Sequence, residues 1–430
     1  MFQAASIPFD AYDRESMAGR ARALGLKAGG EPTRVPGLAN PDVPAISNNT
    51  ATMEDSVLPM GYPLETYPVE TSDGFILRVY RIPHGKKNAT GTGPKPVVLL
   101  HHGVTLASNC WVVLDPDSSM GFYLADAGFD VWMANTRGNT FSRGHKKWKA
   151  TERMYWENSM DELALIDLPA QIDFILDFTK QPKLAIVGHS QGCTLTLMML
   201  SWRADYNDKL WLMMLMGPVA NSMYIKTPFL AQQAKTGSSL LLSMSGIGQF
   251  IPNYATSQLV SGCTFPVKEK WCFDLVNFMF YGPSIYVSSD DFKRCAATWP
   301  AGVSTRNLIH WSQMYHTRNG IYMYDFGENC SASWTQQIPF EESCNQAKYG
   351  FDTPLMYDVG KVTAPAALFE GADDLMGTKE DAAVLVSQWS SPTVFRKIYP
   401  KTAHMDFVWA RRPIMKPDAL KVLWDNAPKV

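Results

Sequence analysis

Short apolar runs, separated by segments of helical length, recur along the chain from residue 75 onward. The stretch FILRVYRI at 75–82 alternates like a half-buried strand, and PVVLLHH at 96–102 is a short apolar run like a fully buried one. Similar runs occupy 129–135, 183–190, 210–217, 364–371 and 394–400. Apolar residues at helical spacing over 160–178, and the segment TLTLMML after residue 190, predict helices between strands. The alternation predicts an α/β fold with a largely parallel sheet covered on both faces.

The alternation of strand and helix patterns lapses between residues 218 and 357. This stretch is rich in Met, Phe, Tyr, Trp and Gly, and it falls between the fifth and the sixth strand candidates. An insertion there would leave the sheet intact, so we expect a largely helical cap or lid at 218–357 on a core formed by 53–217 and 358–430. An ordinary helical subdomain with no role in substrate access is the alternative. Residues 1–52 show little periodicity and are expected to be a poorly ordered N-terminal extension.

Composition narrows the class of protein. With 39 basic and 41 acidic residues, the chain has no excess positive charge for a nucleic-acid partner. The longest uncharged stretch, 236–267, is interrupted by polar residues and Pro, so no transmembrane segment is expected. The first 30 residues carry early charges and show no signal-peptide pattern. Asn48, Asn88 and Asn329 lie in N-x-S/T triplets, which are compatible with a glycoprotein on the secretory route.

The strongest local motif is GHSQG at 188–192, which has the pattern G-x-S-x-G. It directly follows the apolar run LAIV and precedes a helix-compatible segment, which is the strand–turn–helix context of an α/β-hydrolase nucleophile. The sharp turn exposes the serine hydroxyl, and a side chain at either flanking glycine would clash with neighbouring elements. The motif therefore predicts that Ser190 is the nucleophile of an α/β-hydrolase fold.

A serine nucleophile requires a base and an orienting acid, which follow it in the order Ser, acid, His in this fold. Five of the eight histidines precede Ser190 and two fall within the expected cap, so His404 is the predicted base. The acid should lie just beyond the penultimate strand, where Asp373 and Asp374 are adjacent. Sequence spacing does not separate these two carboxylates.

Two backbone N–H groups are expected to stabilise the oxyanion of the tetrahedral intermediate. In this fold one comes from the residue after the nucleophile and the other from the loop after the third strand, which nominates Gln191 and Val104. No H-E-x-x-H, paired C-x-x-C or phosphate-loop motif occurs in the sequence, so no metal or cofactor is implied.

Several segments resemble the acid lipase family, which includes gastric and lysosomal lipases and plant and fungal steryl ester hydrolases. The similar segments are 61–85, HHGV (101–104), LADAGFDVWMANTRGNTFSRGH (124–145), DLPAQIDFI (167–175), GHSQG (188–192), HWSQ (310–313) and AHMDFVWA (403–410). The resemblance implies that Asp374, followed by Leu375 and then by Asp381 seven positions on, is the acid of the triad. It also implies a movable lid, a disulfide between Cys263 and Cys272, and a secreted, lysosomal or vacuolar location.

The sequence hypothesis is serine-dependent hydrolysis of lipid esters, triacylglycerols or steryl esters, at a lipid–water interface. The apolar composition of the expected cap motivates the substrate class. One alternative is a short-chain carboxylesterase or acyltransferase that uses the same three residues. A second alternative is a non-catalytic α/β-hydrolase scaffold that binds a lipid or a protein partner.

Overall fold

The computed structural model describes residues 52–86, 93–228, 248–250, 274, 281–296, 298–317, 319–328, 344–411 and 414–429. The expected extension 1–52 lies outside these residues except for Thr52, which caps helix α2 (Met53–Val57). The proposed disulfide of Cys263 with Cys272 and the three N-x-S/T asparagines also lie outside the described residues.

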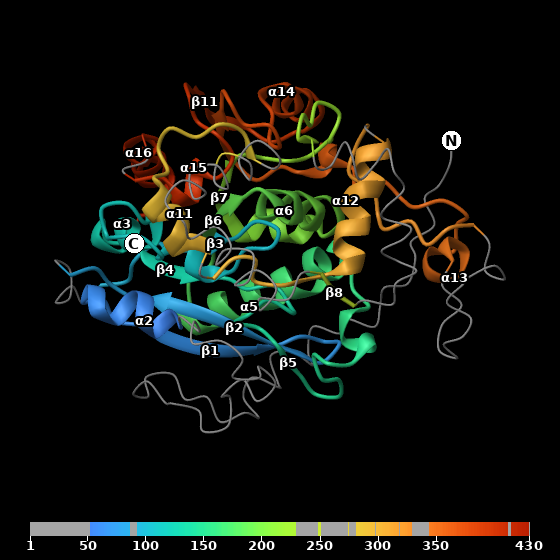
Figure 1. Ribbon diagram of the computed structural model, residues 1–430, viewed down its shortest axis with the longest axis horizontal. Coiled ribbons are helices and arrows are strands. Elements are labelled where there is room, and N and C mark those ends of the chain that lie inside the picture. The colour runs from blue at the N-terminus through green and yellow to red at the C-terminus, as the bar shows by residue number, and fades with distance from the viewer. Residues whose placement is uncertain are drawn as a thin grey trace.

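A mixed, mostly parallel sheet forms the centre of the molecule (Figure 1). Its main path has the order β1-β2-β4-β3-β6-β7-β10-β11, and β5 pairs with β2. The pairs from β4 through β3, β6, β7 and β10 to β11 are all parallel, whereas β2 runs antiparallel to β1, β4 and β5. The strands are β1 (Glu65–Glu70), β2 (Phe75–Ile82), β3 (Val97–His101), β4 (Asp130–Met133), β5 (Gly144–His145), β6 (Leu184–His189), β7 (Leu210–Met216), β10 (Ala366–Gly371) and β11 (Thr393–Tyr399).

Every strand run predicted from the sequence overlaps a strand of this sheet, so the predicted fold class is confirmed. In β3, β4, β6, β7 and β10 every residue is buried, because helices cover both faces. Strands β1 and β5 were not predicted individually. Pro68 lies within β1, and proline is tolerated there because β1 is an edge strand.

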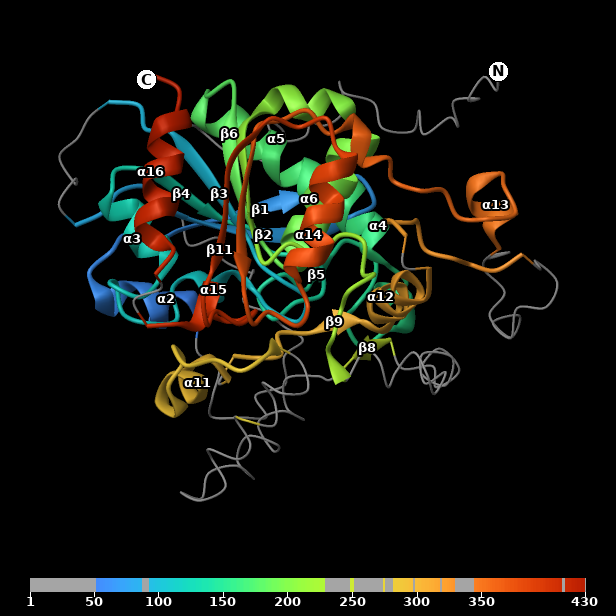
Figure 2. The same cartoon turned by 90° about the horizontal axis from the view of Figure 1, so that it is seen from above.

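Helices form a layer on each side of the sheet (Figure 2). Helices α3 (Met120–Asp126) and α16 (Lys416–Asn426) lie on one side, and α5 (Leu168–Thr179), α6 (Gln191–Trp202) and α14 (Lys379–Gln388) lie on the other. The single helix predicted over 160–178 is divided into α4 (Met160–Glu162), a π-helical segment (Leu163–Asp167) and α5, with Pro169 in the first turn of α5.

The described part of 218–357 contains helices α11 (Ser289–Ala296), α12 (Thr305–Thr317) and α13 (Asn345–Tyr349). It also contributes a two-stranded antiparallel sheet of β8 (Gln249–Phe250) and β9 (Val303–Ser304). Helices α11 and α12 and strand β9 lie along one side of the layered core (Figure 2). The division into a core and a cap with these boundaries stays a prediction.

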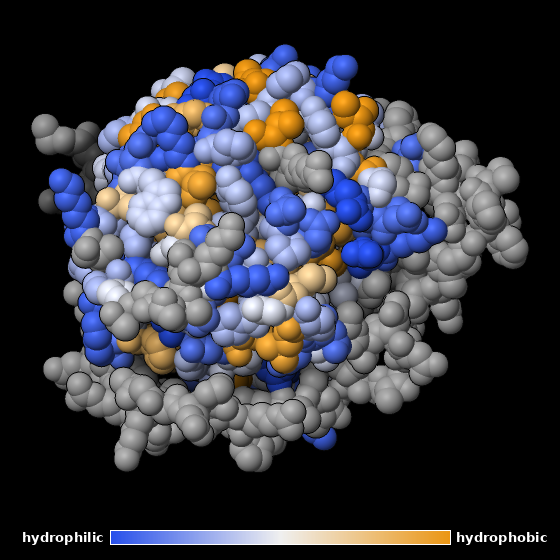
Figure 3. Space-filling view, turned by 90° about the vertical axis from the view of Figure 1, so that its left-hand side faces the viewer, coloured by the Kyte–Doolittle hydropathy of each residue, from blue (hydrophilic) through white to orange (hydrophobic). Residues whose placement is uncertain are grey.

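The face of the molecule in Figure 3 carries hydrophobic side chains in scattered groups among hydrophilic ones. Among the described residues, partly exposed large hydrophobic side chains include those of Trp424 and Ile414 in the C-terminal segment. The ring of Trp424 packs at a tilt against Phe129, at 4.4 Å between centroids, so part of its apolar surface is covered. Single exposed apolar residues of this kind are ordinary on a solvent-facing surface.

Candidate active site

Ser190 forms the turn between strand β6 and helix α6. Its backbone has φ 54° and ψ −120°, a region that residues other than glycine adopt only under strain. The Ser190 N–H donates to Met216 O at 3.1 Å, and its carbonyl accepts from Cys193 N at 2.9 Å. Hydrogen bonds on both sides therefore hold the serine in the turn that its motif predicted.

The two glycines of the motif allow helix α6 to approach the sheet closely. A Cβ atom on Gly192 would lie 2.5 Å from the carbonyl oxygen of His101 in β3. A Cβ atom on Gly188 would lie 2.9 Å from the backbone nitrogen of Cys193. Both neighbours are backbone atoms, which cannot move aside without distorting β3 or α6. The pattern G-x-S-x-G is thus required by packing at this turn.

His404 and Asp374 form a buried hydrogen-bonded pair after strands β11 and β10. His404 Nδ1 lies 2.8 Å from Asp374 Oδ2, and both side chains are almost fully buried. Asp374 Oδ1 accepts from the backbone N–H groups of Met376 and Gly377, each at 2.8 Å. Its neighbour Asp373 is only partly buried, and its backbone N–H donates to Thr402 O. The structure therefore places Asp374 rather than Asp373 against the histidine.

The serine turn and the His–Asp pair meet at Gly217, at the end of β7. A Cβ atom on Gly217 would lie 3.0 Å from Asp374 Oδ2 and 3.1 Å from His404 Nδ1. The preceding residue, Met216, accepts the hydrogen bond from Ser190 N. His404 Nε2 is buried and has no hydrogen-bond partner among the described residues. Because Nδ1 donates its proton to a carboxylate, the lone pair of Nε2 is available to accept a proton.

His189 contributes to this arrangement in a way that the sequence did not indicate. Its Nε2 lies 2.9 Å from the carbonyl oxygen of His404, and the two rings are 4.9 Å apart. Since a carbonyl only accepts, the proton of His189 is on Nε2. Burial, together with the nearby His404, lowers the pKa of His189 well below its usual value. A neutral His189 therefore anchors the backbone of the catalytic-base candidate.

The two proposed oxyanion donors belong to the two backbone segments that adjoin Ser190. A Cβ atom on Gly103 would lie 3.0 Å from Ser190 Cβ and 3.4 Å from Ser190 Oγ, so the Gly103–Val104 peptide adjoins the serine. Gln191 is the first residue of α6, and an N–H group at that position has no acceptor within the helix. The role of the Gln191 and Val104 N–H groups as oxyanion donors stays a prediction.

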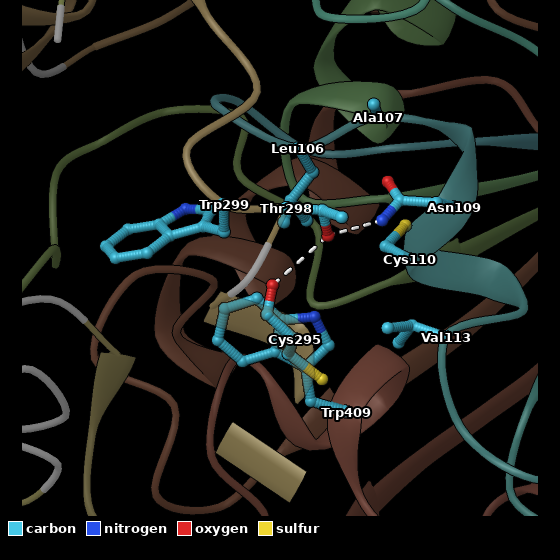
Figure 4. A pocket seen from close by; sticks show the side chains of 9 residues that line it. All are labelled: Leu106, Ala107, Asn109, Cys110, Val113, Cys295, Thr298, Trp299 and Trp409. Carbon is cyan, nitrogen blue, oxygen red and sulfur yellow. Dashed lines mark hydrogen bonds between the residues drawn. The ribbon is translucent and has the colours of Figure 1, made fainter. Parts of the chain in front are cut away.

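A segment at 298–301 crosses the loop that follows β3. Trp299 Nε1 donates to Thr105 Oγ1 at 2.9 Å, and Thr105 Oγ1 donates to Val104 O at 2.6 Å. The Ala301 N–H donates to Thr105 O at 2.7 Å. These bonds hold Thr105 at φ 60°, which is unusual for a β-branched residue. The segment also contacts Asn109, whose Nδ2 donates to Thr298 Oγ1 at 2.5 Å (Figure 4).

A crevice lies between this loop and the crossing segment (Figure 4). Most of its lining is apolar or thiol: Leu106, Ala107, Cys110, Val113, Cys295, Trp299 and Trp409, with Asn109 and Thr298 as the polar exceptions. Burial raises the pKa of the thiols of Cys110 and Cys295 well above the usual value, so both are neutral. The surroundings of the oxyanion loop are therefore apolar on this side.

A second contact from the region after residue 218 reaches the nucleophile turn itself. Trp311, on helix α12, donates from Nε1 to Gln191 Oε1 at 2.6 Å, and both side chains are buried. Tryptophans at 299 and 311 thus each touch one of the two loops that carry an oxyanion-donor candidate. The sequence showed aromatic enrichment in this region but could not indicate these pairings.

The described part of the chain lacks two kinds of feature, a metal-ligand cluster and a membrane-spanning helix. Within it, no group of three or more His, Cys, Asp or Glu side chains is arranged to hold a metal ion. None of the helices in the described ranges is long and apolar enough to span a bilayer. Cys344 is disulfide-bonded, whereas Cys110, Cys193 and Cys295 are free thiols. The disulfide at Cys344 was not predicted.

The topology, the serine turn and the His–Asp pair define the α/β-hydrolase superfamily. The family described as "alpha/beta hydrolase fold" matches residues 96–236, and the "partial alpha/beta-hydrolase lipase region" matches residues 53–115. A soluble variant of monoglyceride lipase from Saccharomyces cerevisiae has a similar structure, with a TM-score of 0.50 and 13% sequence identity. That similarity covers 86% of this chain and 99% of the yeast chain.

Curated relatives identify the family within this superfamily. The chain is 35% identical to human lysosomal acid lipase/cholesteryl ester hydrolase, over 81% of this chain and 84% of the relative. It is 34% identical to mouse gastric triacylglycerol lipase over 87% and 90% of the two chains, and 34% identical to human lipase member M over 81% and 79%. The chain belongs to the acid lipase family, as its motifs suggested.

Proposed function

We propose that this protein hydrolyses lipid esters, triacylglycerols or steryl esters, through an acyl-enzyme on Ser190. The observation that carries the proposal is the buried His404–Asp374 hydrogen bond of 2.8 Å beside a serine in a strained strand-to-helix turn. Two relatives are named for these substrates, one as a cholesteryl ester hydrolase and one as a triacylglycerol lipase. The mostly apolar side chains around the oxyanion loop suit contact with the hydrocarbon portion of such a substrate.

In the first half of the proposed reaction, Ser190 Oγ attacks the ester carbonyl while His404 Nε2 takes the hydroxyl proton. Asp374 holds the imidazole in the Nδ1–H tautomer and stabilises the imidazolium that forms. The N–H groups of Gln191 and Val104 stabilise the oxyanion of the tetrahedral intermediate. The imidazolium then gives its proton to the leaving alcohol, and the C–O bond of the ester breaks.

In the second half, water attacks the acyl-enzyme and His404 accepts a proton from it. A second tetrahedral intermediate collapses, and the proton returns from His404 to Ser190 Oγ as the fatty acid leaves. Among the described residues, His404 Nε2 has no hydrogen-bond partner, so no hydrogen bond joins it to Ser190 Oγ. Catalytic hydrogen bonds are often long before substrate binds and shorten in the complex.

The test is the Ser190→Ala variant assayed with a long-chain fluorogenic ester and with emulsified triacylglycerol and steryl ester. We expect loss of turnover by at least about a thousandfold, because the nucleophile is removed. A fluorophosphonate probe should label the wild-type chain at Ser190 and fail to label the variant. Wild-type turnover in Ser190→Ala would contradict the proposed function. A preference for soluble acetate or butyrate esters would contradict the lipid substrate class only.

A further inference from the structure

The peptide unit joining Gly103 to Val104 is held from its carbonyl side. Gly103 O accepts two hydrogen bonds, from His102 Nδ1 at 2.8 Å and from the Leu106 N–H at 3.2 Å. In a planar trans peptide the carbonyl and the N–H point in opposite directions. Fixing the carbonyl of Gly103 therefore fixes the direction of the Val104 N–H, beside Ser190.

We propose that His102 is a positioning residue that orients the Val104 N–H toward the oxyanion. The inference rests on the proposed function, because it concerns the transition state of that reaction. The hydrogen bonds of the His102 ring go to Gly103 O, the Thr136 N–H and Asn139 Nδ2, and none goes to Ser190. It acts through the Gly103 carbonyl, and its contribution is to remove the freedom of that peptide to rotate before substrate binds.

The protonation state of His102 follows from its neighbours. Its Nε2 faces two donors, the Thr136 N–H at 3.3 Å and Asn139 Nδ2 at 3.2 Å. A backbone N–H can only donate, so Nε2 must accept, and the single proton of the neutral ring is on Nδ1. Nδ1–H then donates to Gly103 O, and every hydrogen-bonding atom of the ring is used. Burial and the adjacent His101 lower the pKa of His102 to about 3, so the ring stays neutral.

Asn139 is itself locked in the orientation that His102 requires. Its Oδ1 accepts from the Phe141 N–H at 3.0 Å, which assigns the amide nitrogen to the opposite side. That nitrogen donates to His102 Nε2 and to Asn135 Oδ1, the latter at 2.9 Å. Asn135 Oδ1 also accepts from the Ser108 N–H at 3.0 Å.

The two asparagines thus anchor both ends of the oxyanion loop. Asn139 secures the loop at His102, and Asn135 secures it at Ser108, where the short helix Ser108–Trp111 begins. Asn135 and Asn139 belong to the segment NTRGN, which follows strand β4, the neighbour of β3 in the sheet. The loop after β4, which carries no proposed catalytic residue, therefore holds the loop after β3 that carries the proposed oxyanion donor Val104.

Two substitutions at His102 separate its hydrogen bond to the Gly103 carbonyl from the space that its ring fills. In His102→Asn the amide nitrogen can occupy the place of Nδ1 and still donate to Gly103 O, whereas His102→Leu fills similar space and donates nothing. We expect His102→Leu to lower kcat about 10- to 100-fold with KM changed less than about threefold, since a misdirected oxyanion donor weakens transition-state binding only. His102→Asn should retain kcat within about fivefold of wild type.

An inhibitor that mimics the tetrahedral intermediate tests the positioning role directly. A purely structural role of His102 would not change its inhibition constant relative to KM. A long-chain alkyl trifluoromethyl ketone forms an oxyanion on the serine, so its inhibition constant should rise in His102→Leu by about the same factor as kcat falls. Fluorophosphonate labelling of His102→Leu should reach the wild-type stoichiometry but at a reduced rate. His310→Leu is the matched control, because His310 is equally buried and bonds a backbone carbonyl, Tyr322 O at 2.8 Å. It should change thermal stability without changing the ratio of ketone affinity to KM.

The outcomes distinguish this inference from the proposed function. Wild-type kcat and ketone affinity in His102→Leu, or equal losses in His102→Leu and His102→Asn, would overturn the positioning role while Ser190 still labels. An unlabelled wild-type chain would overturn the proposed function instead. If His102→Leu does not fold, Asn139→Leu takes its place. That variant frees the ring and should lower kcat about 3- to 10-fold, and an unchanged kcat would again refute the role.

Discussion

Asp374 uses both of its carboxylate oxygens, and each oxygen faces a donor. Oδ1 accepts from two backbone N–H groups and Oδ2 accepts from His404 Nδ1. Such an environment suits an ionised carboxylate, which only accepts, and it is poorly matched to an amide. The site therefore specifies Asp at this position and not its isostere Asn.

In Asp374→Asn the amide oxygen should face the two backbone donors, because they would otherwise meet an NH2 group. The NH2 group then faces His404 Nδ1, which must accept, so the imidazole proton moves to Nε2. That tautomer cannot take the serine proton, and we expect kcat to fall by about 10⁴. The adjacent Asp373→Asn is the matched control. Its kcat should stay within about twofold of wild type, because Asp373 is only partly buried and does not bond His404. Steady-state kinetics on a long-chain ester would measure both, and equal losses in the two variants would refute the assignment.

At the residue scale, the sequence located the turn at Ser190 because a local motif there has a fixed backbone geometry. Ser190 stands in the predicted turn, and the order of residues along the fold led to His404. The choice between Asp373 and Asp374 needed family resemblance. Two adjacent residues lie at nearly the same distance from the predicted strand, and they differ in the direction of their side chains, which the sequence does not show. The contacts of His102 and His189 were not predictable, since a buried histidine's partners come from distant parts of the chain.

At the scale of elements, the position of α6 depends on its contact with β3. Gly192 lies where the helix meets the carbonyl of His101, and the missing side chain permits that approach. The strands were predictable because a parallel sheet covered on both faces demands continuous apolar runs. The π-helical turn at Leu163–Asp167 was not, because the apolar spacing on its own resembles an ordinary helix.

Gly192→Ala tests this contact, because helix propensity and the close approach predict opposite changes in the free energy of unfolding. Alanine normally stabilises a helix by up to about 1 kcal/mol relative to glycine. Here the added Cβ would lie 2.5 Å from a backbone oxygen, so we expect a net loss of about 1–3 kcal/mol in the free energy of unfolding. Gly93→Ala, whose Cβ would meet no atom within 4 Å, is the control and should change little. Urea unfolding curves would decide, and a stabilised Gly192→Ala would show that α6 is free to move away from β3.

At the scale of the whole molecule, polar groups connect distant segments around the site. Arg137 is buried between the carboxylates of Asp167 and Asp73, which keep its guanidinium charged. Asp161 accepts from the hydroxyls of Tyr349 and Tyr357, and so ties the segment that precedes β10 to helix α4. None of these connections is visible in local sequence patterns, since each joins residues far apart in the chain.

One buried carboxyl links the stability of the whole molecule to pH. Asp406 is fully buried, and its Oδ2 accepts from the Ala403 N–H at 2.7 Å while Oδ1 bonds the Ser284 hydroxyl. Burial raises the pKa of Asp406 from 3.8 to about 6, the nearby carboxylates of Asp374 and Asp373 add to the increase, and the two hydrogen bonds oppose it. Between these two values the folded chain binds more protons at this group than the unfolded chain does.

The sign of the pH dependence follows from that difference. Stability falls as pH rises wherever the folded state binds more protons, so this group costs the folded state about 3 kcal/mol between pH 4 and pH 7. Asp406→Asn stays neutral and can keep both hydrogen bonds, with its carbonyl toward Ala403 N and its NH2 toward Ser284 Oγ. We therefore expect the variant to gain stability relative to wild type as pH rises from 4 to 7. Unfolding free energies of the two proteins across this range would test it, and parallel curves would show that Asp406 titrates at the same pH in the folded and unfolded chains.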